Sequence, residues 1–347
     1  MGDSIEAIYK FKGIEDLLKW VDNFVFFRYA CLNESGDSWH YNYDADLIWK
    51  VAETLGWPWA PAKFFDFSHT FSYVGFVWDL DSKTVRISED KCKEFIERMS
   101  TWKEGALVTK RDCEVLVGTL NHCALVLPDG RSRLPSLYRL SGSFANKHRL
   151  ARHRVSKVVS SDVDWWRMRL SSGRCTLVIG ELPAPSPFEI YVDASTSWGI
   201  GCVMDSKWLA WRLKPGWKTD GRDIGWAEMV AVLLALTALV ARGISNAHFI
   251  LRSDNQGVCG ALEGGKLRNE QQNLILCHTV NLFRDHGIWF TIKWVASANN
   301  EADSPSWGLL PPVEDLFPLL PALPFFLKPI VEKPIRRETY NVLRVRS

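Results

Sequence analysis

Residues 188–213 read FEIYVDASTSWGIGCVMDSKWLAWRL and contain three short apolar runs, FEIYVDAS, GIGCVMD and KWLAWRL. Each run is rich in Ile, Val, Tyr or Trp, which favour strands, and Ser, Thr, Gly and Asp gather where one run ends and the next begins, which favours turns. Strands of this length joined by short turns predict an antiparallel meander of three strands.

The chain beyond this meander follows the order helix, strand, helix, helix, strand, helix. The helical segments are Trp226–Ala241, Asn269–Asp285 and Glu301–Trp307, and the strands are HFILRSD (248–254) and GIWFTIKWV (287–295). The longest apolar run, Met229–Ala241, has 13 residues. This is short of the roughly 18 to 20 residues that cross a bilayer, so we expect a buried helix and no membrane association.

Four acids stand where strands end or helices begin: Asp193, Glu228, Asp254 and Asp303. A single acid at such a place is most often a turn or capping residue. Glu228 differs because it lies in an apolar helix, where an unpaired carboxylate is costly. If the four converge at one sheet edge, their mutual repulsion requires cations, and two Mg²⁺ ions suit oxygen ligands and phosphodiester chemistry.

The order Asp, Glu, Asp, Asp on these elements resembles the ribonuclease H fold over Phe188–Trp307. The strings that carry the resemblance are YVDAS, SWGIG, GWAEMVAV, LRSDNQGV and NNEADSPSWG, and they are most similar to ribonuclease H-like domains of retrotransposon polyproteins. The resemblance implies an α/β fold with a mixed five-stranded sheet and flanking helices. It also implies that Asp193 bridges two Mg²⁺ ions, with Mn²⁺ as a substitute, that Glu228 and Asp254 complete the two metal shells, and that Asp303 holds the second ion.

Ahead of such a domain, KWVDNFVFF (19–27) reads as a buried hairpin and resembles the metal-binding hairpin of reverse transcriptases. Asp22 matches the first acid of that motif, whereas Asn23 replaces the second acid and supplies no negative charge. The segment 61–88 resembles the end of the palm. Only about 20 residues precede the hairpin, so the fingers and the strand with the first polymerase Asp are expected to be absent. We therefore predict an α+β remnant that does not polymerise DNA unaided, and whether another chain supplies the missing parts is left open.

The segment Arg131–Cys175 is strongly basic. It has 11 Lys and Arg against 2 acids, a net charge of +9, so the rest of the chain carries −7. Arg149, Arg152, Arg154 and Lys157 recur at helical spacing and predict a nucleic-acid contact, for which a solvated helix face is the alternative. Trp165 and Trp166 fit core packing better than base stacking.

These features predict four regions: a truncated palm remnant (1–87), a helical thumb and connection region with the basic segment (88–180), a ribonuclease H-like domain (187–308) and a Pro-rich, basic tail (309–347). The tail has seven of the 16 prolines, and whether it docks on the body is left open. Eight cysteines without a CxxC pair, and no signal peptide at the start, are typical of reduced thiols in an intracellular protein.

The leading hypothesis is a retroelement-derived protein that binds RNA/DNA hybrids and hydrolyses their RNA strand by two-metal catalysis. The alternative is a domesticated or catalytically silent module that binds nucleic acid without cutting it. An unrelated phosphotransferase or integrase-like nuclease ranks last, because it would require a different acid order.

Overall fold

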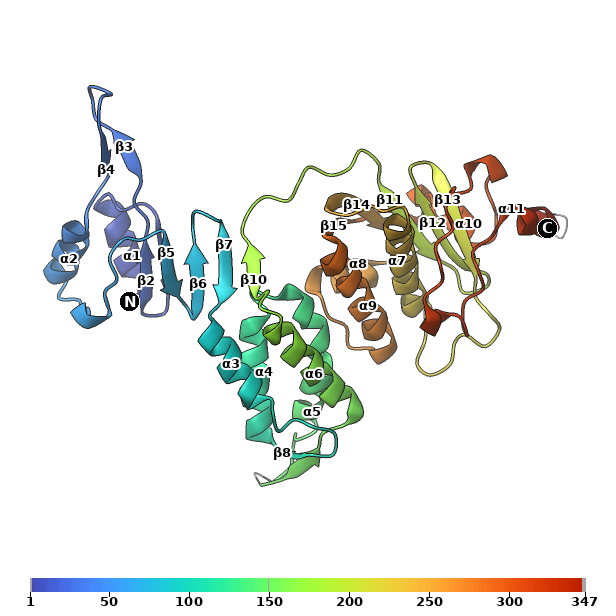
Figure 1. Ribbon diagram of the computed structural model, residues 1–347, viewed down its shortest axis with the longest axis horizontal. Coiled ribbons are helices and arrows are strands. Elements are labelled where there is room, and N and C mark those ends of the chain that lie inside the picture. The colour runs from blue at the N-terminus through green and yellow to red at the C-terminus, as the bar shows by residue number, and fades with distance from the viewer. Residues whose placement is uncertain (1, 149, 345–347) are drawn as a thin grey trace. The chain divides into compact units, whose positions relative to one another are not determined.

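The computed structural model describes residues 2–148 and 150–344, and its ribbon is drawn in Figure 1. The chain divides into two compact units. The first contains Met1–Cys92 and Cys175–Ile179, and the second contains Lys93–Arg174 and Gly180–Ser347. All four predicted metal-binding acids belong to the second unit.

The first unit is built from helices and small antiparallel sheets around an aromatic core. Tyr9 packs edge-on against Phe26, with ring centroids 4.9 Å apart, and its hydroxyl donates to the Ile48 carbonyl. The elements are α1 (Gly2–Phe11), β1 (Leu17–Trp20), β2 (Asn23–Phe26), β3 (Ala30–Leu32), β4 (Trp39–Tyr41), α2 (Ala45–Thr54), η1 (Pro61–Lys63), β5 (Thr70–Tyr73), β6 (Phe76–Asp79), β7 (Thr84–Ile87) and β10 (Thr176–Val178). Strands β10, β7, β6 and β5 form one sheet in that order.

The predicted hairpin at residues 19–27 is present as β1 and β2, and Trp20 pairs with Asn23 across a two-residue turn. Val21 adopts a φ of 57°, which such tight turns require. The hairpin is not buried as expected, because 60% of Trp20 and 77% of Val21 is exposed. Leu17 of β1 and Phe24 and Phe26 of β2 pack on the core, so the strands contact it while the tip is exposed.

The second unit begins with helices and one short two-stranded sheet. Its elements before residue 175 are α3 (Glu89–Arg98), whose first turn belongs to the first unit, β8 (Leu107–Thr109), α4 (Lys110–Cys123), η2 (Pro128–Arg133), α5 (Pro135–Gly142), β9 (Arg152–Arg154) and α6 (Lys157–Ser171). Helix α4 starts with a capping box, in which Thr109 and Asp112 each bond the other's backbone amide.

The helical arrangement expected for the basic residues is wrong. Arg152 and Arg154 lie in β9, which pairs antiparallel with β8, and Lys157 is the first residue of α6. The backbone pairing with Leu107–Thr109 overrides the helical spacing, and the strand alternation leaves both arginines exposed while His153 stacks on Phe144. Arg149 lies outside the described residues.

The remainder of the second unit is a mixed five-stranded sheet with helices, as predicted. Its order is β13-β12-β11-β14-β15, with β11 to β13 antiparallel and β14 and β15 parallel to β11. The elements are β11 (Ile190–Ala194), β12 (Gly199–Met204), β13 (Lys207–Arg212), α7 (Ile224–Ala241), β14 (Ala247–Ser253), α8 (Gln256–Gly264), α9 (Glu270–His286), β15 (Ile288–Trp294), η3 (Ser297–Asn299) and α10 (Asp303–Ser306).

Helix α7 is the centre of this domain. It packs against β11 and β12 and against α9, and 13 of its 18 residues are buried. By length and composition α7 is apolar enough to cross a membrane, but its burial is that of a core helix. The apolar run Met229–Ala241 therefore forms the core helix that the sequence predicts.

The helical region and the sheet domain are joined through η2 and α9. The Ser132 carbonyl accepts from the Asn273 amide at 2.8 Å, and Arg284 pairs with buried Asp129 at 3.1 Å. On the helical side, Gly130 lies against the Trp166 ring so closely that a Cβ would be 2.1 Å from it. The basic strand β9 and the acidic residues are thus parts of one compact unit.

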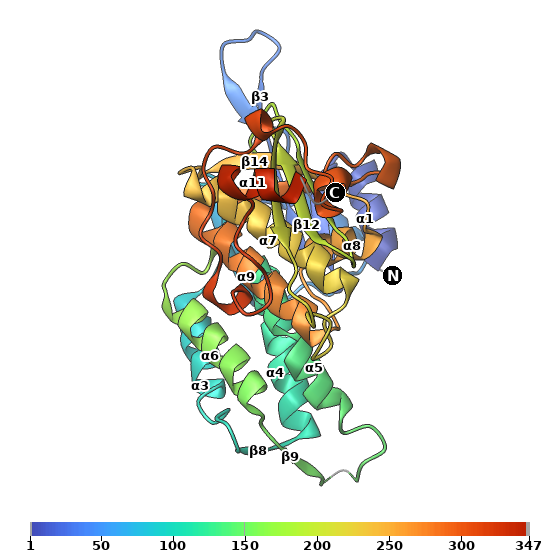
Figure 2. The same cartoon turned by 90° about the vertical axis from the view of Figure 1, so that its right-hand side faces the viewer.

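The C-terminal segment docks on the sheet rather than extending from it. The elements here are η4 (Val313–Asp315), η5 (Phe325–Leu327) and α11 (Arg337–Arg344). Backbone amides of Phe317, Glu332 and Ile335 donate to carbonyls of β13, each at 2.9 Å, so the segment covers the open edge of that strand. Figure 2 shows it in red beside β12.

Candidate metal centre

Asp193 stands near the end of the central strand β11, opposite Gly201 of β12. Only 5% of Asp193 is exposed, and it accepts a hydrogen bond from the Ser306 hydroxyl. Burial raises the pKa of Asp193 to about 6, with further contributions from the carboxylates of Asp254 and Asp303. The local sequence places this acid at the sheet edge because the turn to β12 follows directly.

Glu228 is the fifth residue of α7 and points into the same site. It is 5% exposed, and its Oε2 atom has no hydrogen-bond partner. Burial and then the charges of Asp193 and Asp254 raise the pKa of Glu228 to about 9. A buried carboxylate with an unpartnered oxygen is costly unless a proton or a cation neutralises it.

Asp254 follows β14 and precedes Asn255, which caps α8. Its carboxylate accepts a hydrogen bond from the Ser297 hydroxyl, and its backbone carbonyl accepts one from the Trp294 indole at 2.9 Å. β14 is parallel to β11, so the ends of the two strands bring Asp254 and Asp193 to the same edge of the sheet.

Ligand oxygens of Asp193, Glu228 and Asp254 all lie within 4.8 Å of one another. In residues 2–148 and 150–344 no other trio of His, Cys, Asp or Glu gathers in this way. Three carboxylates at this spacing fit a divalent cation, because an ion supplies the positive charge that the site lacks and a partner for Oε2 of Glu228. The cluster can therefore hold a metal ion.

Asp303, the fourth predicted acid, is the first residue of α10 and lies outside this cluster. It is near enough to contribute to the raised pKa of Asp193. The structure thus brings three of the four acids together and leaves Asp303 beside them.

Neutral residues that the sequence analysis did not single out complete the site. Ser297, Asn300 and Ser306 all hydrogen-bond to its carboxylates. Asn300 and Ser306 are part of the string NNEADSPSWG, in which only the acid was given a role. A signal existed, since hydroxyl and amide side chains clustered around a metal-binding acid are typical of the groups that orient ligands.

Asp22 and Asn23 lie at the exposed tip of the β1–β2 hairpin in the first unit. The Asn23 amide donates to the Asp22 carboxylate at 3.4 Å. Among the described residues, neither belongs to a group of three metal-binding side chains.

Arg152, Arg154 and Lys157 are exposed on the helical part of the second unit. A shallow groove beside them is lined by Arg139, Ser143, Arg154, Ser156 and Glu270, among others. Arg139 pairs with Glu270 of α9 at 2.9 Å, so the groove lies where the helical region meets the sheet domain.

Trp165 and Trp166 occupy different environments. Trp166 is fully buried, as core packing predicts, while Trp165 is half-buried between the guanidinium groups of Arg133 and Arg284 at 5.4 and 5.9 Å.

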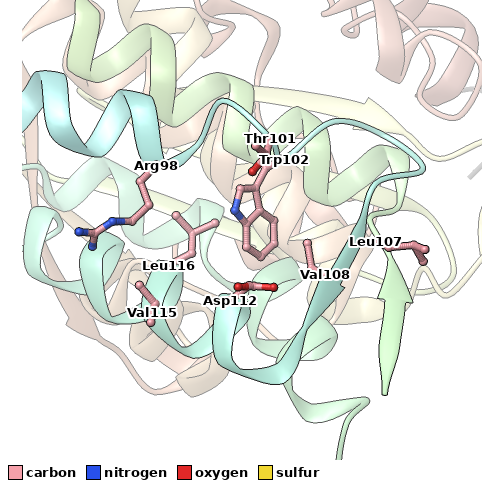
Figure 3. Close-up of a pocket in the computed structure, with 8 residues that line it drawn as sticks. All are labelled: Arg98, Thr101, Trp102, Leu107, Val108, Asp112, Val115 and Leu116. Atoms are coloured by element: carbon pink, nitrogen blue, oxygen red, sulfur yellow. The ribbon is translucent and has the colours of Figure 1, made fainter. Parts of the chain in front are cut away.

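A second hollow, between α3, β8 and α4, has Trp102 and Leu116 on its walls (Figure 3). Its charged lining residues are engaged elsewhere. Asp112 belongs to the capping box of α4, and Arg98 pairs with Glu94 and donates to Thr119. The hollow therefore offers no free charged group to a ligand.

No protein-family model and no curated protein matches the chain. Among solved structures, the chain is similar to RNase H1 from the halophilic archaeon Halobacterium salinarum NRC-1, with 22% sequence identity and a TM-score of 0.26. The similarity covers 35% of this chain and 98% of that one. The functional assignment therefore depends on the residues of the site.

Proposed function

We propose that the chain is a metal-dependent nuclease of the ribonuclease H type that hydrolyses the RNA strand of RNA/DNA hybrids. One observation carries the proposal. Asp193, Glu228 and Asp254, from three different elements, place carboxylate oxygens within 4.8 Å of one another, and the buried Oε2 of Glu228 has no partner. Such a site is unstable as three anions and suited to a hard divalent cation.

Asp193, Glu228 and Asp254 would hold the cations, and Asp303 would complete the shell of the second ion. A pair of Mg²⁺ ions, or Mn²⁺ in their place, supplies the charge that activates a water molecule and stabilises the leaving oxygen of a phosphodiester. The burial of Asp193 and Glu228 keeps bulk water away from their carboxylates, which strengthens their attraction for a cation. In-line attack would leave a 3′ hydroxyl and a 5′ phosphate.

Nucleic-acid binding would use the exposed cations of the same unit. Arg152, Arg154 and Lys157 are exposed, and their positive charges are suited to phosphate groups. Arg149 would join them. Selection of the RNA strand would come from contacts to the 2′ hydroxyl in the wide minor groove of the hybrid.

The remaining regions fit a retroelement origin. Residues 1–87 would form a palm remnant, residues 88–180 the thumb and connection, residues 187–308 the nuclease domain and residues 309–347 the tail. Asn23 in place of an acid, on an exposed hairpin, favours loss of polymerase activity.

A second candidate function is a silent module that binds nucleic acid without cutting it. The exposed arginines of β9 support binding that does not require the acids. The raised pKa of Glu228 also supports it, because a carboxyl group with a pKa of about 9 is neutral at pH 7 until a cation displaces its proton.

Cleavage of a labelled RNA/DNA hybrid tests the proposal, with the parent chain and Asp193→Asn each assayed in Mg²⁺ and in chelator. Cleavage of the RNA strand by the parent alone, and only with Mg²⁺, is the expected result. Salt-sensitive binding of the hybrid without cleavage would refute the nuclease and leave the binding module.

A further inference from the structure

The segment 297–306 runs from the end of β15 through α10 and touches two of the clustered acids. The Ser306 hydroxyl donates to Oδ2 of Asp193, and the Ser297 hydroxyl donates to Oδ2 of Asp254. The Asn300 amide lies 3.4 Å from Oδ1 of Asp254. The segment 297–306 thus contacts one carboxylate near the end of β11 and another that follows β14.

This segment is also fixed to the sheet by bonds that do not involve the acids. The Asn300 amide donates to the Val192 carbonyl of β11 at 3.1 Å, and the Ser195 hydroxyl donates to the Ser306 carbonyl at 2.7 Å. Ser195, Asn300 and Ser306 are each at most 5% exposed. The Ser306 hydroxyl therefore approaches Asp193 from anchored backbone, and the Asn300 amide is held by β11 where it approaches Asp254.

The glycine at position 201 allows α10 to approach β12 this closely. A Cβ on Gly201 would lie 2.4 Å from the Ala302 carbonyl oxygen and 2.6 Å from the Ser306 nitrogen. Helix α10 therefore packs directly on the backbone of β12. Since Gly201 is the register partner of Asp193, this contact puts Ser306 next to that acid.

Ser297, Asn300 and Ser306 are uncharged, so they do not neutralise the acids. What their hydrogen bonds do is restrict the rotation of each carboxylate. Groups that hydrogen-bond to metal ligands in this way commonly change metal affinity by about 10- to 100-fold when they are removed.

We propose that Ser297, Asn300 and Ser306 are positioning residues that hold the carboxylates of Asp193 and Asp254 in the orientation that binds a divalent cation. This inference rests on the proposed role of the acid cluster as a metal centre. It adds that the segment 297–306 sets the affinity of that centre.

Calorimetric titration of the metal-free full chain with Mn²⁺ tests the inference without any turnover. Ser297→Ala and Ser306→Ala are expected to weaken Mn²⁺ binding by about tenfold or more each. Ser297 is exposed, so its variant should fold. Ser297→Thr keeps the hydroxyl and should restore affinity, and Ser304→Ala, an exposed serine in the same segment, should leave it unchanged.

Urea unfolding of the same metal-free variants separates positioning from a merely structural role. Lower stability with unchanged Mn²⁺ affinity in both Ser297→Ala and Ser306→Ala would overturn the inference, as would the absence of Mn²⁺ binding by the parent chain. If the parent binds Mn²⁺ but does not cut the hybrid, the nuclease proposal fails, while the shifts in affinity still decide whether these residues position the acids.

Discussion

Asp193 of β11 and Gly201 of β12 are register partners. Because Gly201 has no side chain, α10 comes close enough for Ser306 to donate a hydrogen bond to Asp193. Helix α10 lies directly over Gly201. A Cβ at this position would be only 2.4 Å from the Ala302 carbonyl oxygen and 2.6 Å from the Ser306 nitrogen. The hydrogen bond to the Asp193 carboxylate thus depends on the glycine at the paired position of the next strand.

Gly201→Ala should therefore disturb both the packing and the acid cluster. The added methyl group collides with backbone atoms of α10 rather than with a flexible side chain, so we expect a loss of about 1 to 3 kcal/mol in the free energy of unfolding. Mn²⁺ affinity should fall with it. Urea unfolding and calorimetric titration of the purified variant measure the two effects.

Gly118→Ala is the matched control, because Gly118 lies in α4 with nothing within 4 Å of a Cβ. Alanine there should stabilise the chain by about 0.5 to 1 kcal/mol, since it favours the helix. A Gly201→Ala chain as stable as the parent would show that α10 moves away at little cost.

The metal-free chain should lose stability as the pH rises from about 5 to 8. The pKa of Glu228 is about 9 in the folded chain and near 4.5 when unfolded, so the folded state holds the proton more tightly across this window. The contribution of Glu228 to the free energy of unfolding is fully present below pH 4.5. It declines by up to about 1.4 kcal/mol per pH unit until the pH exceeds the pKa of the folded chain. Asp193, with a pKa raised to about 6, acts in the same direction.

Urea unfolding in chelator at pH 5 and pH 8 measures this loss, and Glu228→Gln should remove most of it. Mg²⁺ should stabilise the parent more at pH 8 than at pH 5, because the cation competes with protons. A parent chain that becomes more stable between pH 5 and 8 without metal would contradict the burial of an ionisable Glu228.

The order of elements after residue 188 was predictable because its signals are local. Turn residues separate β11, β12 and β13, and the apolar run of α7 has helical length. Three of the four acids could be found because Asp193 and Asp254 stand at strand ends, which gather at a sheet edge, and Glu228 is a costly acid in an apolar helix. Asp303 was expected in the same cluster, but it is the first residue of α10 and lies beside the cluster, whereas Ser306 at the end of the same helix contacts Asp193.

The features that the sequence did not predict depend on distant contacts. β9 pairs with β8, more than 40 positions earlier in the chain, and this pairing outweighs the helical spacing of its arginines. The hydrogen bonds of Ser297 to Asp254 and of Ser306 to Asp193 join residues 43 and 113 positions apart, so local sequence does not show which acid each serine contacts. Docking of the C-terminal segment likewise depends on the open edge of β13.

Phe317→Ala should destabilise the second unit. Phe317 is 1% exposed within the main core, Arg242 lies 5.2 Å from its ring, and its amide donates to the Trp208 carbonyl. Removal of a buried Phe side chain costs about 3 to 5 kcal/mol, and thermal unfolding would show it as a lower melting temperature. Phe325→Ala is the control, because 84% of that ring is exposed. Equal melting temperatures for both variants would contradict the docking of this segment.

Replacement of Arg152 and Arg154 together by alanine should weaken binding of an RNA/DNA hybrid and reduce its salt dependence. Both side chains are exposed on β9, and each phosphate contact that is lost lowers the slope of log affinity against log salt by about 1. Fluorescence anisotropy with a labelled hybrid in chelator, over a series of salt concentrations, measures the slope without cleavage. Lys50→Ala, an exposed cation on α2 in the first unit, is the control and should leave the slope unchanged. If the double variant keeps the parent's slope, β9 does not contact phosphate, and the basic residues of this region are an ordinary solvated surface.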